Sequence, residues 1–300
     1  MDNPAEAFLR LSREDLSVLS SIEAGMRAHE WVPIQEIARQ SGLSLRKVEY
    51  RLRILSEQKL VTRTTIHYEG YQIDFDAYDL LAISDLLKRD FITCIGDKIG
   101  VGKESVVYEA LGRSPLVIKF HRQGRTSFKH VRRARDHLTD LPRLPWLHAA
   151  SLAARHEFQV MQRLYPEVSV PRPVALSRHA LAMELIYGDQ LNKVVLSNPQ
   201  DSLETILDEV GKTYRLGIVH ADLSEFNVMV TAEGLKLKII DWPQAVETDH
   251  PNATQLLERD VSNVLKFFVR RYKIDLSLEE AISRVKSTSV NGASQEAALQ

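Results

Sequence analysis

Apolar residues recur at helical spacing through the first part of the chain and then give way to a β-rich stretch. The spacing predicts helices over residues 12–26, 33–40 and 44–55. Residues 61–73 are rich in β-branched and aromatic side chains around a Glu-Gly pair and predict a hairpin. Three helices followed by a hairpin are typical of a winged helix-turn-helix, which we expect to occupy residues 1–78.

The pattern changes again after this domain. A strongly apolar helix is predicted over residues 79–90, as a linker. Strand patterns then dominate residues 91–186, interrupted by a basic loop at 122–145 whose first part, 122–135, has no acidic residue, whereas residues 187–288 are mainly helical. The polar stretch 289–300 is expected to fray as a disordered tail. The fold class predicted is α+β, with a two-lobed domain behind the winged helix.

The third predicted helix has a basic second face. Its side chains suit contact with phosphates and base edges, so we expect nucleic acid to bind at Arg46, Lys47, Tyr50, Arg51 and Arg53. A solvated face of a packing helix is the alternative interpretation. Because the surrounding region is acidic, any binding is expected to be local and steeply dependent on salt.

A glycine-rich turn and a strand lysine are candidates for phosphate binding. Gly100 and Gly102 let backbone N–H groups approach phosphates, while Lys103 and Ser105 add polar groups. A plain β-turn explains this stretch equally well. Lys119 lies in an apolar strand pattern, where burial is costly unless a carboxylate and a phosphate pair with it. A lysine at a strand edge that reaches water is the alternative.

Two later segments could complete a nucleotide site. The amphipathic helix predicted at 151–165 carries Glu157, the expected carboxylate partner of Lys119. The strand over 180–185 leads into an extended segment whose backbone groups could meet an adenine edge.

The strongest chemical signal is an Asp followed by an Asn five residues later and another Asp fourteen beyond that. Asp222 would orient an attacking hydroxyl, and Asn227 with Asp241 would offer hard oxygen ligands to Mg²⁺. Strand patterns at 228–230 and 236–240 predict a hairpin that brings the two metal ligands together. A chance loop of polar residues is the alternative. Further along, Asp260 is expected either to brace this loop or to be exposed.

Composition excludes several other classes. The 300 residues are 44% apolar and 26% charged, with a net charge of −1, so no global field favours nucleic acid. The single cysteine excludes a disulfide framework and a cysteine-ligated metal site. Neither a secretory signal nor a membrane-length apolar run is present, and a cytoplasmic protein is expected.

The order of these motifs resembles a protein-kinase-like fold, and their details resemble the RIO family of atypical protein kinases. The winged helix is similar to that of the second RIO type. The resemblance covers residues 5–285 and rests on four strings, at 102–105, 125–128, 220–227 and 240–244.

This resemblance implies an ATP- and Mg²⁺-dependent atypical serine kinase and ATPase, with Mn²⁺ as an alternative metal, that acts in small ribosomal subunit maturation. The subunit precursor or its rRNA would bind through the winged helix and the basic loop. The implied site residues are Asp222 and Lys119 in catalysis, Asn227 and Asp241 at the metal, Gly100, Gly102, Lys103, Ser105, Glu157, Met183, Glu184 and Ile186 at ATP, and Ser127 as an autophosphorylation site.

Some features depart from protein kinases that act on peptides. Ala221 precedes Asp222 where an arginine would read a phosphorylated activation loop, and little chain separates Asp241 from the next helix. We therefore expect autophosphorylation or ATP hydrolysis to be favoured over free-peptide phosphorylation. A small-molecule kinase of the aminoglycoside or choline type, or a non-catalytic nucleotide-sensing regulator that binds nucleic acid, are the alternatives.

Overall fold

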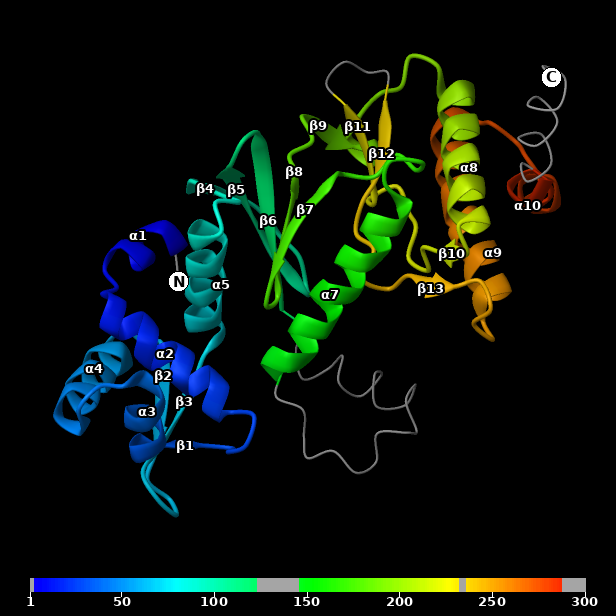
Figure 1. Ribbon diagram of the computed structural model, residues 1–300. Helices are drawn as coiled ribbons and strands as arrows, with labels where there is room; N and C mark the ends of the chain where they lie inside the picture. Colours follow the sequence, from blue (N-terminus) through cyan, green and yellow to red (C-terminus); the bar gives the residue numbers. More distant parts are fainter. Residues whose placement is uncertain (1–2, 123–145, 232–235, 288–300) are drawn as a thin grey trace, which may run out of the picture. The chain divides into compact units, whose positions relative to one another are not determined.

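The computed structural model describes residues 3–122, 146–231 and 236–287 (Figure 1). The expectations for Ser127, for the basic loop beyond Arg122 and for the C-terminal tail lie outside these residues. The chain forms two compact units. Unit 1 comprises Met1–Ala154 and Ala175–Ala182, and unit 2 comprises Arg155–Val174 and Met183–Gln300.

Unit 1 begins with the predicted winged helix-turn-helix. Its elements are α1 (Pro4–Leu9), α2 (Arg13–Gly25), β1 (Val32–Pro33), α3 (Ile34–Ser41), α4 (Leu45–Glu57), β2 (Val61–Thr64) and β3 (Gly70–Ile73). Ser12 and Asp15 form a capping box at the start of α2. Gly42 ends α3 at φ 70°, a left-handed conformation that favours glycine, and so makes the tight turn into α4.

The winged-helix core is apolar and its sheet is small. The strands form an antiparallel sheet in the order β1-β3-β2. The helices bury Leu19, Ile22, Ile37, Leu52 and Leu55 completely or nearly so. This arrangement confirms the winged helix-turn-helix.

The linker helix α5 (Phe75–Lys88) starts four residues before the predicted position. Its first turn already contains buried residues, Ala77 and Tyr78, so the apolar face continues further toward the N-terminus than the sequence pattern indicated. Asp79 is also buried, and it forms an ion pair with Arg122 and a 2.8 Å hydrogen-bond contact with His179. The helix is therefore a central element of unit 1.

Most of the five-stranded sheet belongs to unit 1. It has the order β4-β5-β6-β8-β7, built from β4 (Cys94–Val101), β5 (Ser105–Leu111), β6 (Pro115–His121), β7 (Pro173–Ser177) and β8 (Ala180–Glu184). The long helix α7 (Trp146–Leu164) starts in unit 1 and ends in unit 2.

Residues 155–174 belong to unit 2, although the predicted N-lobe runs over 91–186. Hydrogen bonds to distant residues of unit 2 explain this assignment. The N–H of Ser169 donates to Glu209 at 2.6 Å, and the carbonyl oxygen of Ser169 accepts from Ile239 N at 2.8 Å.

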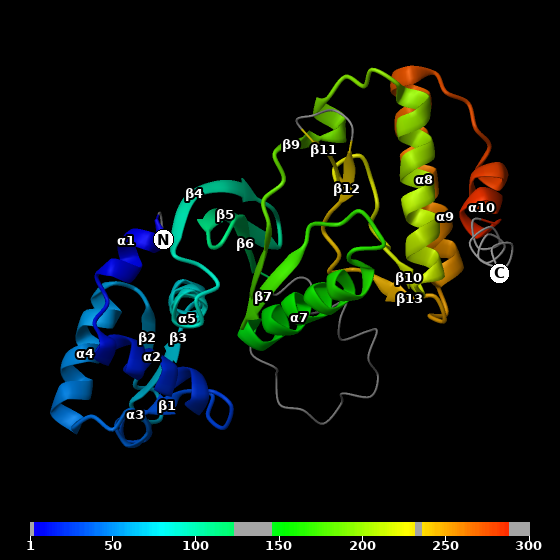
Figure 2. The same ribbon diagram turned by 45° about the horizontal axis from the view of Figure 1, so that its top comes forward.

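Unit 2 is a helical unit with small sheets. Its remaining elements are β9 (Gly188–Gln190), η1 (Leu191–Lys193), α8 (Pro199–Arg215), β10 (Ile218–Val219), β11 (Val228–Thr231), β12 (Leu237–Ile239), β13 (Val246–Glu247), α9 (Ala253–Tyr272) and α10 (Leu278–Ser287). Strands β11 and β12 confirm the predicted hairpin, and β9 joins them in the order β12-β11-β9. Helices α8 and α9 lie side by side in both views (Figure 2).

None of the described helices is long and apolar enough to span a membrane.

Candidate active site

The loop that carries Asp222 starts at the short strand β10 and is fixed by its own histidine. His220 is buried, its Nε2 lies 3.1 Å from the carbonyl oxygen of Ile240, and its ring centroid is 4.4 Å from that of Trp242. The next residue, Ala221, has φ 61°, a left-handed conformation that an alanine adopts only at a cost of about 1–2 kcal/mol. The turn therefore needs support from its surroundings.

Helix α9 supplies that support through a buried carboxylate. Asp260 accepts hydrogen bonds from the N–H groups of Ala221 (2.7 Å, Oδ2) and Leu223 (3.0 Å, Oδ1), the residues on either side of Asp222. Burial raises the pKa of Asp260 to about 6, against the lowering effect of these two N–H donors. The bracing role expected for Asp260 agrees with this geometry.

Two further residues of α9 hold the same loop. Arg259 donates to the carbonyl oxygen of Ala221, and Asn263 donates to that of Leu223 at 3.1 Å. Both the N–H and the C=O groups on either side of Asp222 are thus held by one helix. Sequence reasoning missed Arg259 and Asn263, because no local motif marks them.

The structure brings the three predicted oxygen-bearing residues into one hydrogen-bonded segment. Asn227 Nδ2 donates to the carbonyl oxygen of Asp222 at 2.8 Å, and Ile240 N donates to the carbonyl oxygen of Asn227 at 2.9 Å. The register pairs Val228 with Ile239, so Asn227 and Asp241 lie at the same end of the β11–β12 hairpin.

This donor set fits Mg²⁺. Asn227 and Asp241 offer side-chain oxygens, and Mg²⁺ in phosphoryl-transfer sites is held by one or two such groups together with waters and substrate phosphates. Within the described residues no group of three or more His, Cys, Asp or Glu side chains could hold a metal on its own.

Glu157 is connected to the segment that follows Asp241. This glutamate is fully buried on α7, and its Oε1 accepts a hydrogen bond from Trp242 N at 3.1 Å. The Trp242 ring is itself fully buried and donates to the carbonyl oxygen of Ile239 at 3.1 Å. This connection was not predicted. The expected pairing of Glu157 with Lys119 stays a prediction.

Lys119 and the glycine-rich turn share one sheet in unit 1. Val107 on β5 pairs with Gly100 on one side and with Lys119 on the other, so the three residues form a row across adjacent strands. Gly102 N donates to the carbonyl oxygen of Ser105 at 2.8 Å and closes the turn. Lys119 is only 5% exposed on an interior strand, which rules out the strand-edge alternative. Lys103, in the same turn, is exposed.

The segment expected to meet an adenine edge starts where the chain enters unit 2, at Met183. Glu184 is held within unit 2: its Oε2 accepts from Arg172 N at 3.0 Å and from Lys238 Nζ at 2.9 Å. Burial would raise the pKa of Glu184, but these two hydrogen bonds outweigh burial and lower it. Ile186 lies two residues further on, outside the strand.

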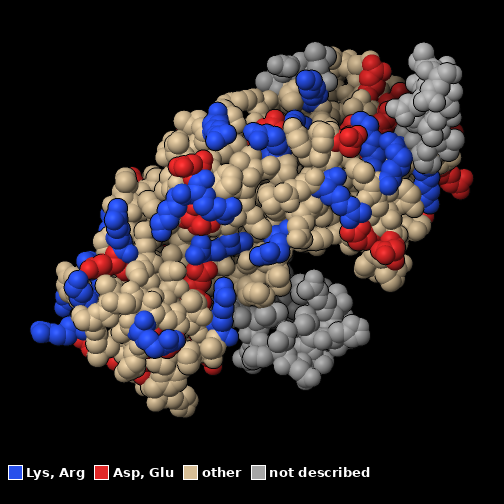
Figure 3. Space-filling view, viewed as in Figure 1, with Lys and Arg blue, Asp and Glu red and all other residues tan. Residues whose placement is uncertain are grey.

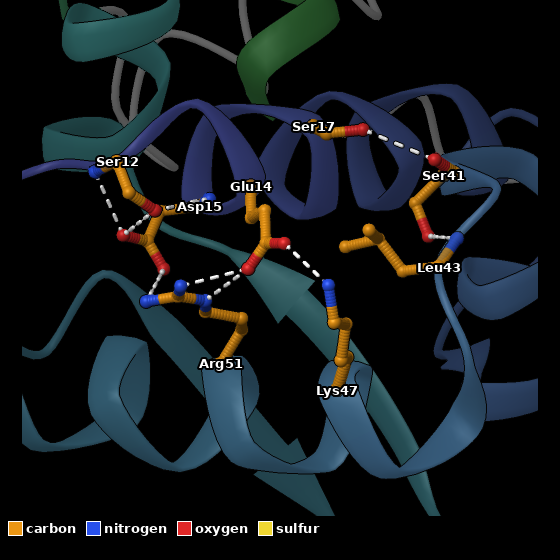
Figure 4. Close-up of polar contacts among 8 residues, drawn as sticks. All are labelled: Ser12, Glu14, Asp15, Ser17, Ser41, Leu43, Lys47 and Arg51. Carbon is orange, nitrogen blue, oxygen red and sulfur yellow. Dashed lines mark hydrogen bonds and ion pairs between the residues drawn. The ribbon is translucent and has the colours of Figure 1, made fainter.

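The five predicted nucleic-acid contacts separate into two groups on α4. Arg46, Tyr50 and Arg53 are exposed and form no ion pair with a described residue, whereas Lys47, which is also exposed, and Arg51 form ion pairs with Glu14 of α2 (Figure 4). On the molecular face in Figure 3, basic and acidic side chains are interspersed. This agrees with the expectation that any basic partner surface is local.

An aspartate loop next to a hairpin that carries two oxygen-bearing side chains, in a chain with a strand lysine and a glycine-rich turn, is typical of a protein-kinase-like phosphotransferase. Comparison with known protein families agrees. The RIO domain matches residues 106–281, and the family described as Rio2, N-terminal, matches residues 8–89.

Individual relatives narrow the class. The RIO-type serine/threonine-protein kinase Rio2 of Methanocaldococcus jannaschii is 41% identical over 259 residues, which cover 83% of this chain and 94% of that protein. The serine/threonine-protein kinase rio2 of Schizosaccharomyces pombe is 37% identical over 292 residues, 94% of this chain and 83% of that protein. The Rio2 kinase of Chaetomium thermophilum, solved as an ADP/Mg²⁺-phosphoaspartate complex, has a TM-score of 0.80 at 29% identity and covers 98% of this chain and 95% of that chain. The chain belongs to the RIO2-type serine/threonine-protein kinases.

Proposed function

We propose that this kinase binds ATP with Mg²⁺ and works mainly by autophosphorylation or ATP hydrolysis. The observation that carries the proposal is the loop in unit 2. Helix α9 holds the backbone on both sides of Asp222, while Asn227 and Asp241 lie at one end of a hairpin. A positioned carboxylate beside two oxygen ligands suits phosphoryl transfer, where catalysis consists mostly of positioning and charge stabilisation.

Each of the site residues has one role in this proposal. The Asp222 carboxylate orients the attacking hydroxyl or water and accepts its proton. Asn227 and Asp241 hold the metal ion, which neutralises the charge of the phosphate oxygens when it is bound. In unit 1, Lys119 and the turn from Gly100 to Ser105 are assigned to phosphate binding. Met183, Glu184 and Ile186 are assigned to the adenine end, Glu157 to pairing with Lys119.

The preference for hydrolysis or self-modification rests on the segment after Asp241. Trp242 is fully buried, and β13 within this segment pairs with β10. A segment whose residues are buried or paired in a strand in this way offers little surface for docking a peptide. The relative from Chaetomium thermophilum was solved with a phosphoaspartate, and Asp241 is the residue we assign to that modification here. Ser127 remains the proposed serine acceptor.

The cellular role is proposed from the family resemblance. We assign the chain to maturation of the small ribosomal subunit in the cytoplasm, with contact to the subunit precursor or its rRNA through the winged helix and the basic loop. The exposed side chains of Arg46, Tyr50 and Arg53 support this contact. The family assignment favours the kinase over the small-molecule kinase and the non-catalytic regulator.

The test is Asp222→Asn, with release of phosphate and self-labelling measured in ATP and Mg²⁺. We expect a loss of at least about a hundredfold, as for removal of a positioned catalytic group. Asp249→Asn, at an exposed position of the same unit, is the matched control and should retain full activity. Unchanged hydrolysis in Asp222→Asn would show that the carboxylate has no catalytic part.

A further inference from the structure

Two of the basic side chains on α4 already form ion pairs with a carboxylate of the same domain. Glu14, in the first turn of α2, places Oε1 at 2.9 Å from Lys47 Nζ and Oε2 at 2.7 Å from Arg51 Nη2 and 3.0 Å from Arg51 Nε (Figure 4). Arg51 Nη1 also lies 3.8 Å from Asp15 Oδ1. Hydrogen bonds from Lys47 and then Arg51 lower the pKa of Glu14, so its carboxylate is charged at neutral pH.

The other three side chains face solvent and have a different character. Tyr50 is 51% exposed, and the guanidinium carbons of Arg51 and Arg53 lie 5.5 and 5.4 Å from its ring centroid. Arg46 and Arg53 form no ion pair with any residue that the structure describes. An exposed aromatic ring with cations close to it suits stacking on a base together with contacts to neighbouring phosphates.

These observations favour single-stranded RNA as the ligand of α4. The deep, narrow major groove of duplex RNA does not admit side chains that read bases, whereas unpaired bases stack readily on aromatic and guanidinium planes. A phosphate that follows the stacked base along α4 would meet Lys47 and Arg51. There it would have to replace the Glu14 carboxylate.

We propose that Glu14 is an intramolecular competitor of the RNA phosphate at Lys47 and Arg51, and that it sets the affinity of the winged helix for single-stranded RNA. The proposal rests on the RNA contact proposed above. Glu14 is partly exposed, with 32% of its side chain accessible, so the ion pairs are reachable by a competing phosphate. In the free protein the single Glu14 charge is shared by Lys47 and Arg51 and compensates part of their two positive charges. RNA that displaces it exchanges one anion for another.

The exchange has a signature in the dependence of binding on salt. Each phosphate that a free cation neutralises on a single strand releases counterions and adds about 0.7 to the slope of log affinity against log salt. A cation that is already paired with a carboxylate of the protein contributes less to this slope. Removal of the Glu14 charge therefore raises the affinity and also makes the salt dependence steeper.

The experiment compares Glu14→Gln with wild type in the full-length chain. Fluorescence anisotropy of a labelled oligouridylate is measured at several salt concentrations. We expect Glu14→Gln to bind about threefold to tenfold more tightly at low salt, with a slope steeper by about 0.7, because the loss of one carboxylate charge uncovers one cationic charge.

Glu36→Gln is the matched control. It removes the same charge from the same domain, at a side chain paired with Arg39 on α3. Arg39 lowers the pKa of Glu36 to about 2, so this control residue is ionised as well. We expect its affinity to change less than about twofold, with no change in slope. Equal gains in the two variants, or no gain in Glu14→Gln, overturn the proposal.

A second pair of variants keeps the test independent of the folding of Glu14→Gln. In the otherwise wild-type chain, Arg46→Gln should weaken binding more than Lys47→Gln, because Lys47 is already compensated. Equal losses overturn the role of Glu14. If Arg46→Gln leaves binding unchanged, the RNA contact of α4 itself is refuted, and the proposal falls with it. Hydrolysis of ATP should be the same in all of these variants, so failure here is distinguishable from failure of the kinase assignment.

Discussion

Asp260→Asn tests the geometry of the Asp222 loop most directly. In the wild type both carboxylate oxygens of Asp260 accept, from Ala221 N and Leu223 N. Asparagine has one acceptor oxygen, and its amide group would face one of the two N–H donors. The variant loses a hydrogen bond to a charged acceptor, which is worth about 1.5–3 kcal/mol. If that loss appears in the position of Asp222, the turnover number for ATP hydrolysis falls by about tenfold to a hundredfold.

The effect of pH on Asp260 separates its two roles. Its pKa is raised from 3.8 to about 6, chiefly by burial, so between these values the folded protein binds a proton that the unfolded chain does not. The contribution of this group to stability therefore falls as pH rises through that window, by up to about 3 kcal/mol. Activity should change in the opposite direction, because a protonated carboxyl has lost one acceptor. Below about pH 6 the wild type is expected to gain stability from this group and to lose turnover.

Two measurements check this reasoning. The turnover number and KM for ATP are followed from acidic to mildly alkaline pH, and urea unfolding is followed over the same range. We expect Asp260→Asn to lower turnover with little change in KM, and to lack the acid limb near pH 6. Glu258→Gln, exposed on the same helix, is the control and should behave as wild type. An acid limb that persists near pH 6 in Asp260→Asn would refute the reasoning.

Three further changes test the supports of the fold. Ala221→Gly should raise the free energy of unfolding by about 1 kcal/mol in urea, because glycine adopts φ 61° without the Cβ penalty; a loss of stability would contradict this. Asp79→Ala should lower the free energy of unfolding by about 3–5 kcal/mol in the same assay, since it leaves the Arg122 charge without its buried partner. A loss under about 1 kcal/mol would show that the ion pair contributes little to stability. Gly188→Ala should cost about 1–3 kcal/mol, seen as a lower melting temperature, because a Cβ there would overlap the carbonyl oxygen of Val230; an unchanged melting temperature would contradict the close strand approach.

The elements that were predictable depend on short-range patterns. The helices α2 and α4 have apolar residues at regular helical spacing, and both the 61–73 and the β11–β12 hairpins follow alternating strands around a turn. Such patterns specify the local structure and the buried face together. The start of α5 was placed four residues too late, because its first turn was assigned to the winged-helix domain, 1–78.

The candidate site was predictable to the extent that it lies within one stretch of chain. The strand patterns at 228–230 and 236–240 predicted a hairpin with Asn227 and Asp241 at one end, which the structure contains. The partners that hold them come from far away in the sequence: the Glu157–Trp242 bond joins residues 85 positions apart, and Asn263 lies 40 positions from Leu223. Such pairs depend on how helices pack, and no local period encodes them.

The same distinction explains why the sequence predicted only part of the surface of α4. A basic helix face looks uniform along the chain, and Lys47 and Arg51 carry the same charge as Arg46 and Arg53. The two pairs differ in their distance from Glu14, which lies 33 positions before Lys47 in the sequence. Helix α2 places Glu14 next to Lys47 and Arg51.

Several unfavourable features of unit 2 lie around one loop. Ala221 and Asp241 both have left-handed φ values, 61° and 71°, and Asp260 is a buried acid whose charged form burial disfavours. Conformations of this kind cost on the order of 1–3 kcal/mol each and persist only where the surroundings over-determine them. Here the surroundings are the hydrogen bonds from α9 and the β11–β12 hairpin, and all of them act on the backbone around Asp222 and Asn227. A chain selected for stability alone would relieve this strain with glycine and an apolar helix face. This chain instead uses four hydrogen bonds from α9 to hold the two residues on either side of one aspartate. For this physical reason we assign the phosphoryl-transfer chemistry to Asp222.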